Sequence, residues 1–560
     1  MVLVALAVLG SICTQGASGQ GQADDQRVVH GTAVNAVTHE PIGRALVYSP
    51  DNRFATLTDS EGHFEFTLPK VGTDPQRGSV SFGRRDGSLD WLMARKPGFL
   101  DDANHGTQIP ASPGRELTIS LLPEALIKGR IVLSGNDSAI GIDVQLVSRQ
   151  VLEGLPHWQL ISTIQANSNG EFRFAELLPG TYKLVTRELL DDDPATAVPG
   201  GQLYGFPPIV YPGVTDFAAG STIQLAAGQT FQADISLERQ PYYPVRIPVV
   251  AADPGPGINV NVSVDGHPGP GYSLGYNAEK QRIEGLLPNG NYLVEAVTLG
   301  MNAATGAVNI AVAGAPVERP SMVLTRNVSI PVNVAEEFTS TNWQGFGSAS
   351  NGRRTFRVHG PRLYLQVMVE PVDDFGQQGR ATIRPPTGPA DDSLILENLS
   401  PGRYWLRLSS SRGYVAAATM GGVDLLHQPL LVLSGSSTPI EITMRDDGAE
   451  LEGTLAGLKS SMGVDATYQG ASLPQAFVYC IPLPDSPGQF QQLWTYPDGK
   501  FNSPMIAPGT YRVLAFNRQQ PNLPYRDADG MRAYETKGQI IHVVAGQKQN
   551  LELQVITGGE

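Results

Sequence analysis

Cysteine is almost absent from this sequence of 560 residues, in which only Cys13 and Cys480 occur. One pair of cysteines is too few for the disulfide framework that holds small secreted domains together. Cys480 lies in AFVYCIP, an apolar run typical of a strand, so we expect a buried and unreactive thiol there. The fold is therefore expected to depend on its hydrophobic cores and turns.

Charged residues are also scarce, at 17% of the sequence. So low a content argues against long solvated helices and against a disordered polyelectrolyte. The 54 acidic residues outnumber the 40 basic ones and give a formal net charge of −14, which disfavours nucleic acid or an anionic membrane surface as a partner. The hydrophobic fraction of 41% is that of a globular protein.

Long hydrophobic runs are missing after the N-terminus. The run from Val2 to Ile12 is shorter than the roughly 20 residues that cross a bilayer, and it fits the core of a signal peptide. Ala17 and Gly19 are small residues at the positions that precede a cleavage before Gln20. We therefore predict a signal peptide over residues 1–19, no later membrane-spanning segment, and an exported protein of the periplasm, the outer surface or the medium.

Helical periodicity is nearly absent as well. The 62 glycines and 43 prolines interrupt any apolar pattern of three-to-four spacing before it extends over a dozen residues. Short apolar and polar alternations between turn residues take its place and predict strands. Since 560 residues exceed what one hydrophobic core organises, several all-β domains are expected.

A short pattern recurs along the chain at intervals of 110, 112 and 107 residues. Its anchor is a turn glycine: Gly180, Gly290, Gly402 and Gly509. Two residues after each glycine stands a tyrosine, and an aliphatic residue follows two positions later, which is the alternation of a half-buried strand. The tyrosines are Tyr182, Tyr292, Tyr404 and Tyr511. We interpret them as structural residues that hold a turn, as the tyrosine corner does in immunoglobulin-like domains; a stacking platform for a ligand is the alternative.

A second turn precedes this pattern. Glu61-Gly62, Asn169-Gly170 and Asp498-Gly499 each lead into a phenylalanine two residues later. Glycine adopts the positive φ angles of tight hairpin turns, so each of these pairs predicts a hairpin. Each repeat is therefore expected to contain a turn, a strand, a second turn and a strand that begins near the tyrosine.

The repeat divides the chain into five modules, a name kept below. We predict β-sandwiches at 27–122 (module 1), 126–239 (module 2), 241–325 (module 3), 326–445 (module 4) and 448–556 (module 5). Module 3 has the least regular pattern, because ADPGPG and GHPGPG interrupt it. A period of this length suits a two-sheet antiparallel sandwich, and the fold class is predicted as a tandem array of about five immunoglobulin-like or prealbumin-like sandwiches after a signal peptide.

Module 1 resembles a known family. The stretch VVHGTAVNAVTHEPIGRALVYSPDNRFATLTDSEGHFEFTLP, followed by ARKPGF, is similar to the carboxypeptidase regulatory-like domain. The residues that match its pattern are Gly31, Val34, Pro41, Ile42, Ala45, Val47, Thr58, Asp59, Gly62, Phe64, Phe66, Lys96, Gly98 and Phe99. The resemblance implies a seven-stranded prealbumin-like sandwich without catalysis, grouped with carbohydrate-binding folds. The second turn, PKVGTD, departs from the proline-glycine-x-tyrosine pattern of the other modules.

Catalytic and metal-binding patterns are weak. None of the nine histidines is followed by a glutamate three positions later, and no cysteine cluster exists, so neither a zinc site nor any cofactor is predicted. Asp191–Asp193 and Asp373–Asp374 lack the ligand spacing of a calcium loop. The G-x-S-x-G match at Gly271–Gly275 would make Ser273 a nucleophile, but it stands in a glycine- and proline-rich loop without a helix after it.

Aromatic residues in predicted loops are the candidate ligand contacts. Sugar rings pack on flat aromatic faces while neighbouring polar groups bind the hydroxyls. The candidates are Trp158, Tyr204, Phe206, Tyr211 and Trp343. Packing of each ring against its own sandwich is the alternative.

Three hypotheses for function follow. The first is a non-enzymatic, exported array that binds a polysaccharide or a component of the cell envelope, with repetition supplying avidity. The second is a structural spacer or adhesion stalk without a ligand site. The third, with the least support, is a hydrolase that uses Ser273.

Overall fold

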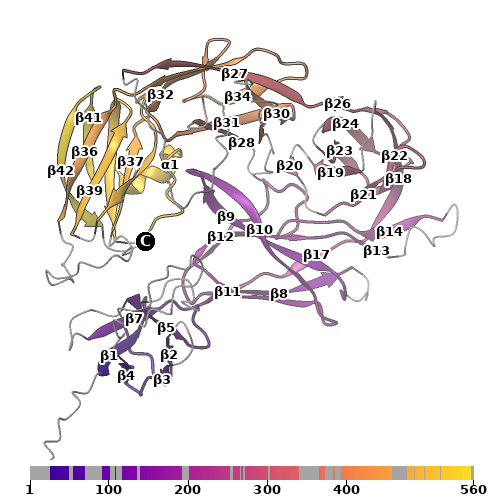
Figure 1. The fold of residues 1–560 in the computed structure, drawn as a ribbon. Helices are drawn as coiled ribbons and strands as arrows, with labels where there is room; N and C mark the ends of the chain where they lie inside the picture. Colours follow the sequence, from indigo (N-terminus) through magenta and orange to yellow (C-terminus); the bar gives the residue numbers. More distant parts are fainter. Residues whose placement is uncertain are drawn as a thin grey trace, which may run out of the picture. The chain divides into compact units, whose positions relative to one another are not determined.

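The computed structural model describes residues 26–49, 54–69, 91–100, 107–108, 116–134, 139–191, 201–251, 257–264, 267–268, 271–300, 303–339, 365–372, 382–384, 393–456, 476–484, 486–496, 498–517 and 519–556. The predicted signal peptide lies outside these ranges. Strands make up almost all of the regular structure, which confirms the all-β fold class (Figure 1). The helical elements in these ranges are α1 (Ala528–Met531) and the 3-10 turn η1 (Arg532–Tyr534), and neither is long or apolar enough to cross a bilayer.

The chain divides into two compact units, and the boundary lies between Pro123 and Glu124. The first unit contains module 1, and the second contains modules 2 to 5. Five large hydrophobic clusters occupy successive stretches of the sequence, at Val29–Leu121, Ala125–Leu237, Val245–Leu324, Val328–Met444 and Ala449–Leu553. Each cluster falls within the limits of one module, apart from a one-residue offset at Ala125.

Module 1 contains β1 (Gln26–Asn35), β2 (Leu46–Tyr48), β3 (Ala55–Leu57), β4 (His63–Pro69), β5 (Trp91–Arg95), β6 (Thr107–Gln108) and β7 (Leu117–Leu121). They form two sheets, in the orders β4-β1-β7 and β3-β2-β5-β6. Thr58 holds the loop before β2, because its hydroxyl donates to the carbonyl of Ile42 at 2.6 Å and accepts from the amide of Ala45 at 2.8 Å. Lys96 Nζ donates to the carbonyl of Gly43 at 2.7 Å. Several residues that carry the family resemblance thus have structural partners.

Module 2 contains β8 (Ala125–Leu133), β9 (Asp143–Leu152), β10 (Leu155–Gln165), β11 (Glu171–Leu177), β12 (Gly180–Thr186), β13 (Leu189–Leu190), β14 (Leu203–Phe206), β15 (Ile223–Leu225), β16 (Thr230–Gln232) and β17 (Ile235–Leu237). One sheet has the order β10-β9-β12-β15 and the other β11-β8-β16, with β17 also paired to β8. The short strands β13 and β14 join the sheet of module 3 through β18.

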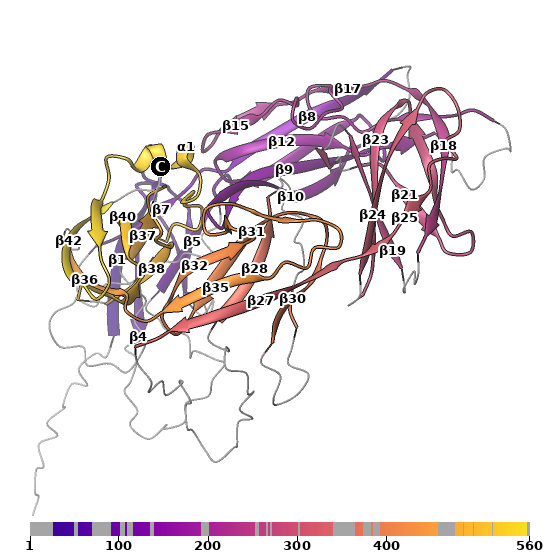
Figure 2. The same ribbon diagram turned by 90° about the horizontal axis from the view of Figure 1, so that it is seen from above.

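Module 3 contains β18 (Gln240–Val250), β19 (Ile258–Val264), β20 (His267–Pro268), β21 (Leu274–Asn277), β22 (Arg282–Pro288), β23 (Gly290–Thr298), β24 (Ala304–Val312), β25 (Met322–Val323) and β26 (Thr325–Arg326). The sheet β13-β14-β18-β22-β21 and the sheet β20-β19-β23-β24-β26 enclose its core (Figure 2). Although this module has the least regular sequence pattern, its two layers are built like those of its neighbours.

Module 4 contains β27 (Val328–Glu337), β28 (Leu365–Pro371), β29 (Thr382–Ile383), β30 (Leu394–Leu399), β31 (Gly402–Ser410), β32 (Tyr414–Met420), β33 (Val423–Asp424), β34 (Leu430–Val432) and β35 (Ile440–Arg445). Its sheets have the orders β29-β30-β27-β35-β32-β33 and β28-β31-β34. Alternate residues of β27 are buried and exposed, as expected for a strand with one face toward the core.

Module 5 contains β36 (Ala449–Ala456), β37 (Phe477–Pro482), β38 (Gln491–Thr495), β39 (Lys500–Ile506), β40 (Gly509–Phe516), β41 (Gln539–Val543) and β42 (Lys548–Ile556), together with α1 and η1. The strands follow the order β37-β38-β39-β36-β42-β40-β41, and β37 also pairs with β40. Cys480 is fully buried in β37, and burial raises the pKa of its thiol, which agrees with the predicted unreactive cysteine.

Each module also contains at least one parallel pairing, which a purely antiparallel sandwich does not predict. The first strand of a module pairs in parallel with a strand near its end: β1 with β7, β8 with β16 and β17, β18 with β25, β27 with β35, and β36 with β42. Parallel neighbours need a long connection, and here the rest of the module supplies it. The two ends of each module therefore lie side by side.

The recurring tyrosines hold their turns, which confirms their structural interpretation. In each case the phenolic hydroxyl donates to the backbone carbonyl four residues earlier. Tyr182 reaches Leu178 at 2.7 Å, Tyr292 reaches Pro288 at 3.0 Å, Tyr404 reaches Ser400 at 2.9 Å, and Tyr511 reaches Ala507 at 2.6 Å. All four rings are buried, so the repeat preserves a turn and a core position together.

A glycine at a close contact also recurs in the first strand of three modules. Gly31, Gly129 and Gly453 each lie against a backbone carbonyl near the end of their module and against a phenylalanine of the neighbouring antiparallel strand. A Cβ on Gly129 would lie 1.7 Å from the carbonyl oxygen of Ala233 and 2.6 Å from Cζ of Phe172. Only glycine allows the backbones to approach this closely.

Candidate functional site

Trp158 lies inside module 2 and is 6% exposed. It belongs to β10, where its ring packs edge-on against Phe217 with 5.5 Å between centroids. Lys183 Nζ lies 5.3 Å from the Trp158 centroid and 4.6 Å from that of Phe217, and it donates to the carbonyl of Phe217 at 2.5 Å. Arg149 lies over the Trp158 ring at 5.3 Å. The ring is thus enclosed by protein groups, in a satellite core between β9, β12 and the following loop.

The other candidates in module 2 have different environments. Phe206 is 2% exposed and belongs to the main core. Tyr211 is half-buried and packs edge-on against Phe231 at 6.1 Å. Tyr204 is 37% exposed, and the guanidinium of Arg239 lies 4.5 Å from its ring centroid. Tyr204 is therefore the most exposed of the four candidates in module 2, with Arg239 over its ring. Trp343 lies outside the described residues.

Ser273 contributes to a junction between modules 2 and 3. Its backbone amide donates to Oε1 of Glu188 at 2.7 Å, and its hydroxyl also bonds this carboxylate. The residues that follow form strand β21, whereas a nucleophile elbow requires a helix there. The Glu188 amide also donates a hydrogen bond to the carbonyl of Gly271. These contacts hold the GYSLG segment of module 3 against module 2, which is a structural role.

Glu188 is the most unusual titratable group of this junction. Burial raises its pKa to about 7, against the opposing effect of its bonds to Ser273. Among the described residues, Glu188 Oε2 and the Tyr242 hydroxyl are buried without a hydrogen-bond partner. Tyr272 and Tyr292 lie nearby with hydrogen-bonded hydroxyls, and burial raises both of their pKa values. This environment favours the neutral form of the Glu188 carboxyl, so the stability of the folded protein is expected to depend on pH.

A second junction joins module 2 to modules 4 and 5. Glu153 and Gly154 form the two-residue turn between β9 and β10, with φ angles of 50° and 83°. The Glu153 carboxylate accepts from Arg407 Nη1 of module 4 and from the Tyr525 hydroxyl of module 5, the latter at 3.2 Å. The carbonyl of Gly154 accepts from the Arg526 amide at 3.1 Å. One hairpin tip thus contacts two modules that lie far along the sequence.

Further charges and rings surround this tip. Glu370 lies 3.6 Å from Arg407 and 3.8 Å from Arg526, and burial together with the nearby Glu153 raises its pKa. Tyr525 stacks on Phe490 with 3.8 Å between centroids, and its other neighbour is Gly154, where a Cβ would lie 2.8 Å from the ring. The tight fit explains the glycine, and the alternating charges hold the three modules together.

We expect Glu153→Ala to loosen this junction without unfolding module 2. The variant removes two charge-assisted hydrogen bonds, at a cost of about 2 kcal/mol for partly exposed groups. Hydrogen exchange at the Arg526 amide, which donates to Gly154, is then expected to rise about tenfold or more.

Asp498→Ala is the matched control for that experiment. Asp498 also precedes a turn glycine, but its carboxylate bonds Lys500 within its own hairpin. Exchange at Arg526 should stay unchanged in this variant. Equal exchange in Glu153→Ala and the wild-type chain would show that the junction does not depend on the carboxylate.

Sequence reasoning did not single out two other exposed aromatic residues, Trp494 and Tyr496 in module 5. They stand two residues apart directly before the PDG turn, a spacing that places both on one face of a strand. It also did not identify the Glu153 junction, although the Glu-Gly pair in VLEGLP is a turn signal. Among the described residues, no group of three or more potential metal ligands comes together.

Comparison with known proteins gives little further information. No family model matches the sequence, and no curated protein matches it. A Streptococcal ancillary pilin is similar in structure over 54% of this chain and 99% of its own length, with 12% identity and a TM-score of 0.18. The minor pilin GBS52 of Streptococcus agalactiae matches 38% of this chain and 95% of its own, with 12% identity and a TM-score of 0.18. The shaft pilin of Lactobacillus rhamnosus GG matches 38% of this chain and 97% of its own length, with 11% identity and a TM-score of 0.17. Similarities this low carry no argument about the function of this chain.

Proposed function

We propose that this protein is an exported, non-catalytic, multi-module binding protein whose ligand is a polysaccharide or another component of the cell envelope. The resemblance of module 1 to the carboxypeptidase regulatory-like domain, a non-catalytic sandwich, is part of this proposal. Tyr204, with its exposed ring beside Arg239, is the ligand contact that remains among the sequence candidates in module 2.

The contact between module 2 and module 5 is the observation that favours a binding protein over a spacer. A spacer gains its length when each unit contacts only the units before and after it. Here the hairpin tip at Glu153 and Gly154 contacts Tyr525 and Arg526, three modules further along the chain. A contact between modules so far apart in the sequence does not serve a spacer, because it does not lengthen the array. It restrains modules 2 and 5 relative to each other, which favours the presentation of several surfaces to one extended ligand.

Co-sedimentation with an envelope fraction and with insoluble polysaccharides tests this proposal. We expect the full chain to be retained on at least one of these materials, and Tyr204→Ala to weaken the retention about fivefold. Trp158→Ala is unsuitable as a binding variant, because removal of an enclosed ring leaves a cavity and destabilises the module. Tyr243→Ala, at a half-buried tyrosine of module 3, serves as the control. No retention on any material would leave the spacer as the better hypothesis.

A further inference from the structure

Module 5 exposes two aromatic side chains on one face of the hairpin of β38 and β39: Trp494 lies in β38, and Tyr496 follows directly after this strand. Trp494 is 75% exposed and Tyr496 is 46% exposed, whereas Leu493, which precedes Trp494 and points to the other face, is buried. The amide of Tyr496 donates to the carbonyl of Lys500 at 2.8 Å, so the hairpin of β38 and β39 continues past Trp494. Tryptophan is usually well buried in folded proteins, and a large apolar ring left in solvent indicates an interaction surface.

Polar side chains continue this face across the sheet. The strand register places Trp494 beside Asn502, Asn502 beside Glu452, and Glu452 beside Asn550. Neighbouring strands are about 4.8 Å apart, so this row of four residues extends over about 14 Å. Within the described part of the chain, the side-chain amides of Asn502 and Asn550 make no hydrogen bond, and both residues are exposed. Donors and acceptors are thus available directly beside the aromatic rings.

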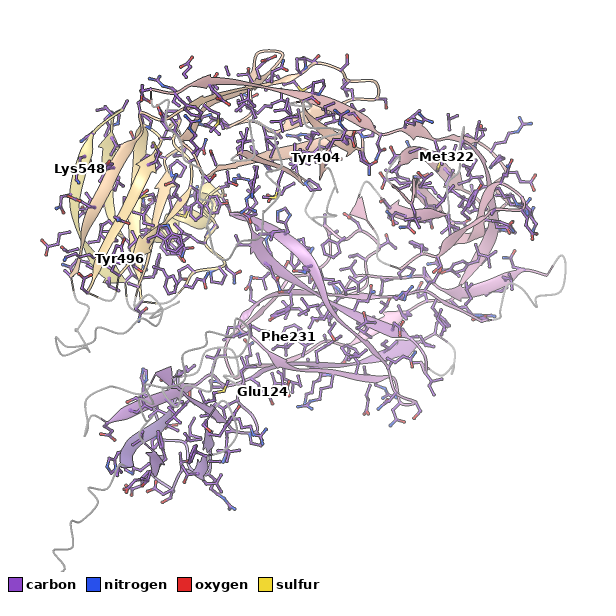
Figure 3. The ribbon with its side chains drawn as sticks, in the orientation of Figure 1. Glu124, Phe231, Met322, Tyr404, Tyr496 and Lys548 are labelled. Carbon is purple, nitrogen blue, oxygen red and sulfur yellow. The ribbon has the colours of Figure 1, made fainter. Side chains whose placement is uncertain are left out.

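The charges of the face are mostly paired within it. Lys548 Nζ lies 3.2 Å from Glu452 and 3.6 Å from Glu450, and Lys500 Nζ lies 3.0 Å from Asp498 (Figure 3, where Lys548 and Tyr496 are labelled). The amines are therefore already occupied, and carboxylates outnumber them. Such a face disfavours acidic polymers and anionic lipid headgroups, and it suits an uncharged ligand rich in hydroxyl groups.

We propose that Trp494 and Tyr496, with Asn502 and Glu452 beside them, form a binding surface for a neutral polysaccharide. The rings pack against the apolar faces of successive sugars, while the amide and carboxylate groups hydrogen-bond their hydroxyls. This inference rests on the proposed function, to which it adds a second surface and a class of ligand. Because Trp494, Asn502 and Glu452 lie on paired strands of the sheet, their relative positions are fixed before the ligand binds.

Affinity electrophoresis of the full chain tests the site. The gels contain soluble starch, xyloglucan, galactomannan or a β-1,3-glucan as probes. The wild-type chain is expected to be retarded by at least one of them, and Trp494→Ala to bind that polysaccharide about tenfold more weakly or worse. Asn502→Ala, which removes a hydrogen-bonding group and no ring, is expected to weaken binding about threefold. Circular dichroism and thermal unfolding establish that both variants are folded.

Ile540→Ala is the matched control, because Ile540 is 58% exposed in β41 of the same module but lies outside this row. Wild-type binding in Trp494→Ala together with loss in Tyr204→Ala would overturn this site and leave the proposed function intact. Retention on the envelope fraction with no retardation by any neutral polysaccharide would also overturn this site and leave the proposed function intact. No retention on either material would overturn both. Sedimentation velocity adds a further outcome: a dimer that Trp494→Ala converts to a monomer, without polysaccharide binding, would make this face a self-association surface and overturn the proposal.

Discussion

Gly129→Ala is expected to destabilise module 2 by at least about 3 kcal/mol, because no side-chain movement makes room for the new methyl group. A Cβ at this position would lie 1.7 Å from the backbone oxygen of Ala233 in the segment between β16 and β17. This clash is relieved only if β8 separates from its parallel neighbours β16 and β17, and those pairings close the core of the module. Urea unfolding followed by limited proteolysis of module 2 measures the effect.

Gly275→Ala is the control for this variant. Gly275 lies in β21, and nothing lies within 4 Å of the position where its Cβ would be. This change should move the unfolding midpoint very little. If Gly129→Ala unfolds at the same urea concentration as the wild-type chain, the close approach of β8 to Ala233 does not exist in solution. The equivalent changes at Gly31 and Gly453 extend the test to modules 1 and 5, where the carbonyl oxygens of Leu117 and Leu551 lie 2.3 Å and 2.1 Å from the new Cβ.

The second large effect is expected at Glu188, whose carboxyl links module 2 to Ser273. Burial raises the pKa of this carboxyl from an ordinary 4.5 to about 7, so the folded protein retains its proton when the unfolded chain has lost it. The stabilisation is fully present below pH 4.5 and is lost as the pH rises from 4.5 to about 7. Over that range it amounts to up to about 3 kcal/mol.

Glu188→Gln is expected to remove this pH dependence. The amide oxygen still accepts the hydrogen bond from the Ser273 amide, and the side chain stays neutral at every pH. The variant should match the wild-type chain at pH 4 and unfold several degrees higher at pH 8, as measured by calorimetry. Glu238→Gln, at an exposed residue of the same module, should follow the wild-type curve throughout. A constant difference between Glu188→Gln and the wild type across this range would contradict the buried, protonated carboxyl.

Much of the fold is predictable because its determinants are local. Glycine turns are local, and the hairpin predicted at Asp498-Gly499 joins the paired strands β38 and β39. The hairpins predicted at Glu61-Gly62 and Asn169-Gly170 are wrong, because these turns lead from a strand of one sheet to a strand of the other. Alternation such as that after Gly180 sets the strands. The repeat adds independent copies of the same pattern, and the tyrosine at each copy makes the same hydrogen bond to the carbonyl four residues earlier. Local chemistry of this kind is the same wherever the segment lies in the molecule.

The candidate sites were harder to predict, because exposure depends on what packs against a residue. Trp158 stands among turn residues and suggests a loop, yet it lies in β10 under Lys183 and Phe217. Leu493 and Trp494 point to opposite faces of β38, and it is the ring of Trp494 that faces solvent. Alternation identifies two faces of a strand but does not identify which face a second sheet covers.

The sequence by itself determined the all-β class, the period of the repeat, and the turns that each tyrosine holds, since these depend on residues within a few positions of one another. Only the tertiary structure decided which aromatic rings meet solvent, which glycine lies against a carbonyl from the far end of its module, and that Glu153 meets Arg407 and Tyr525. Those partners are separated by 254 and 372 residues, and no local pattern encodes a contact that arises when folded modules pack together.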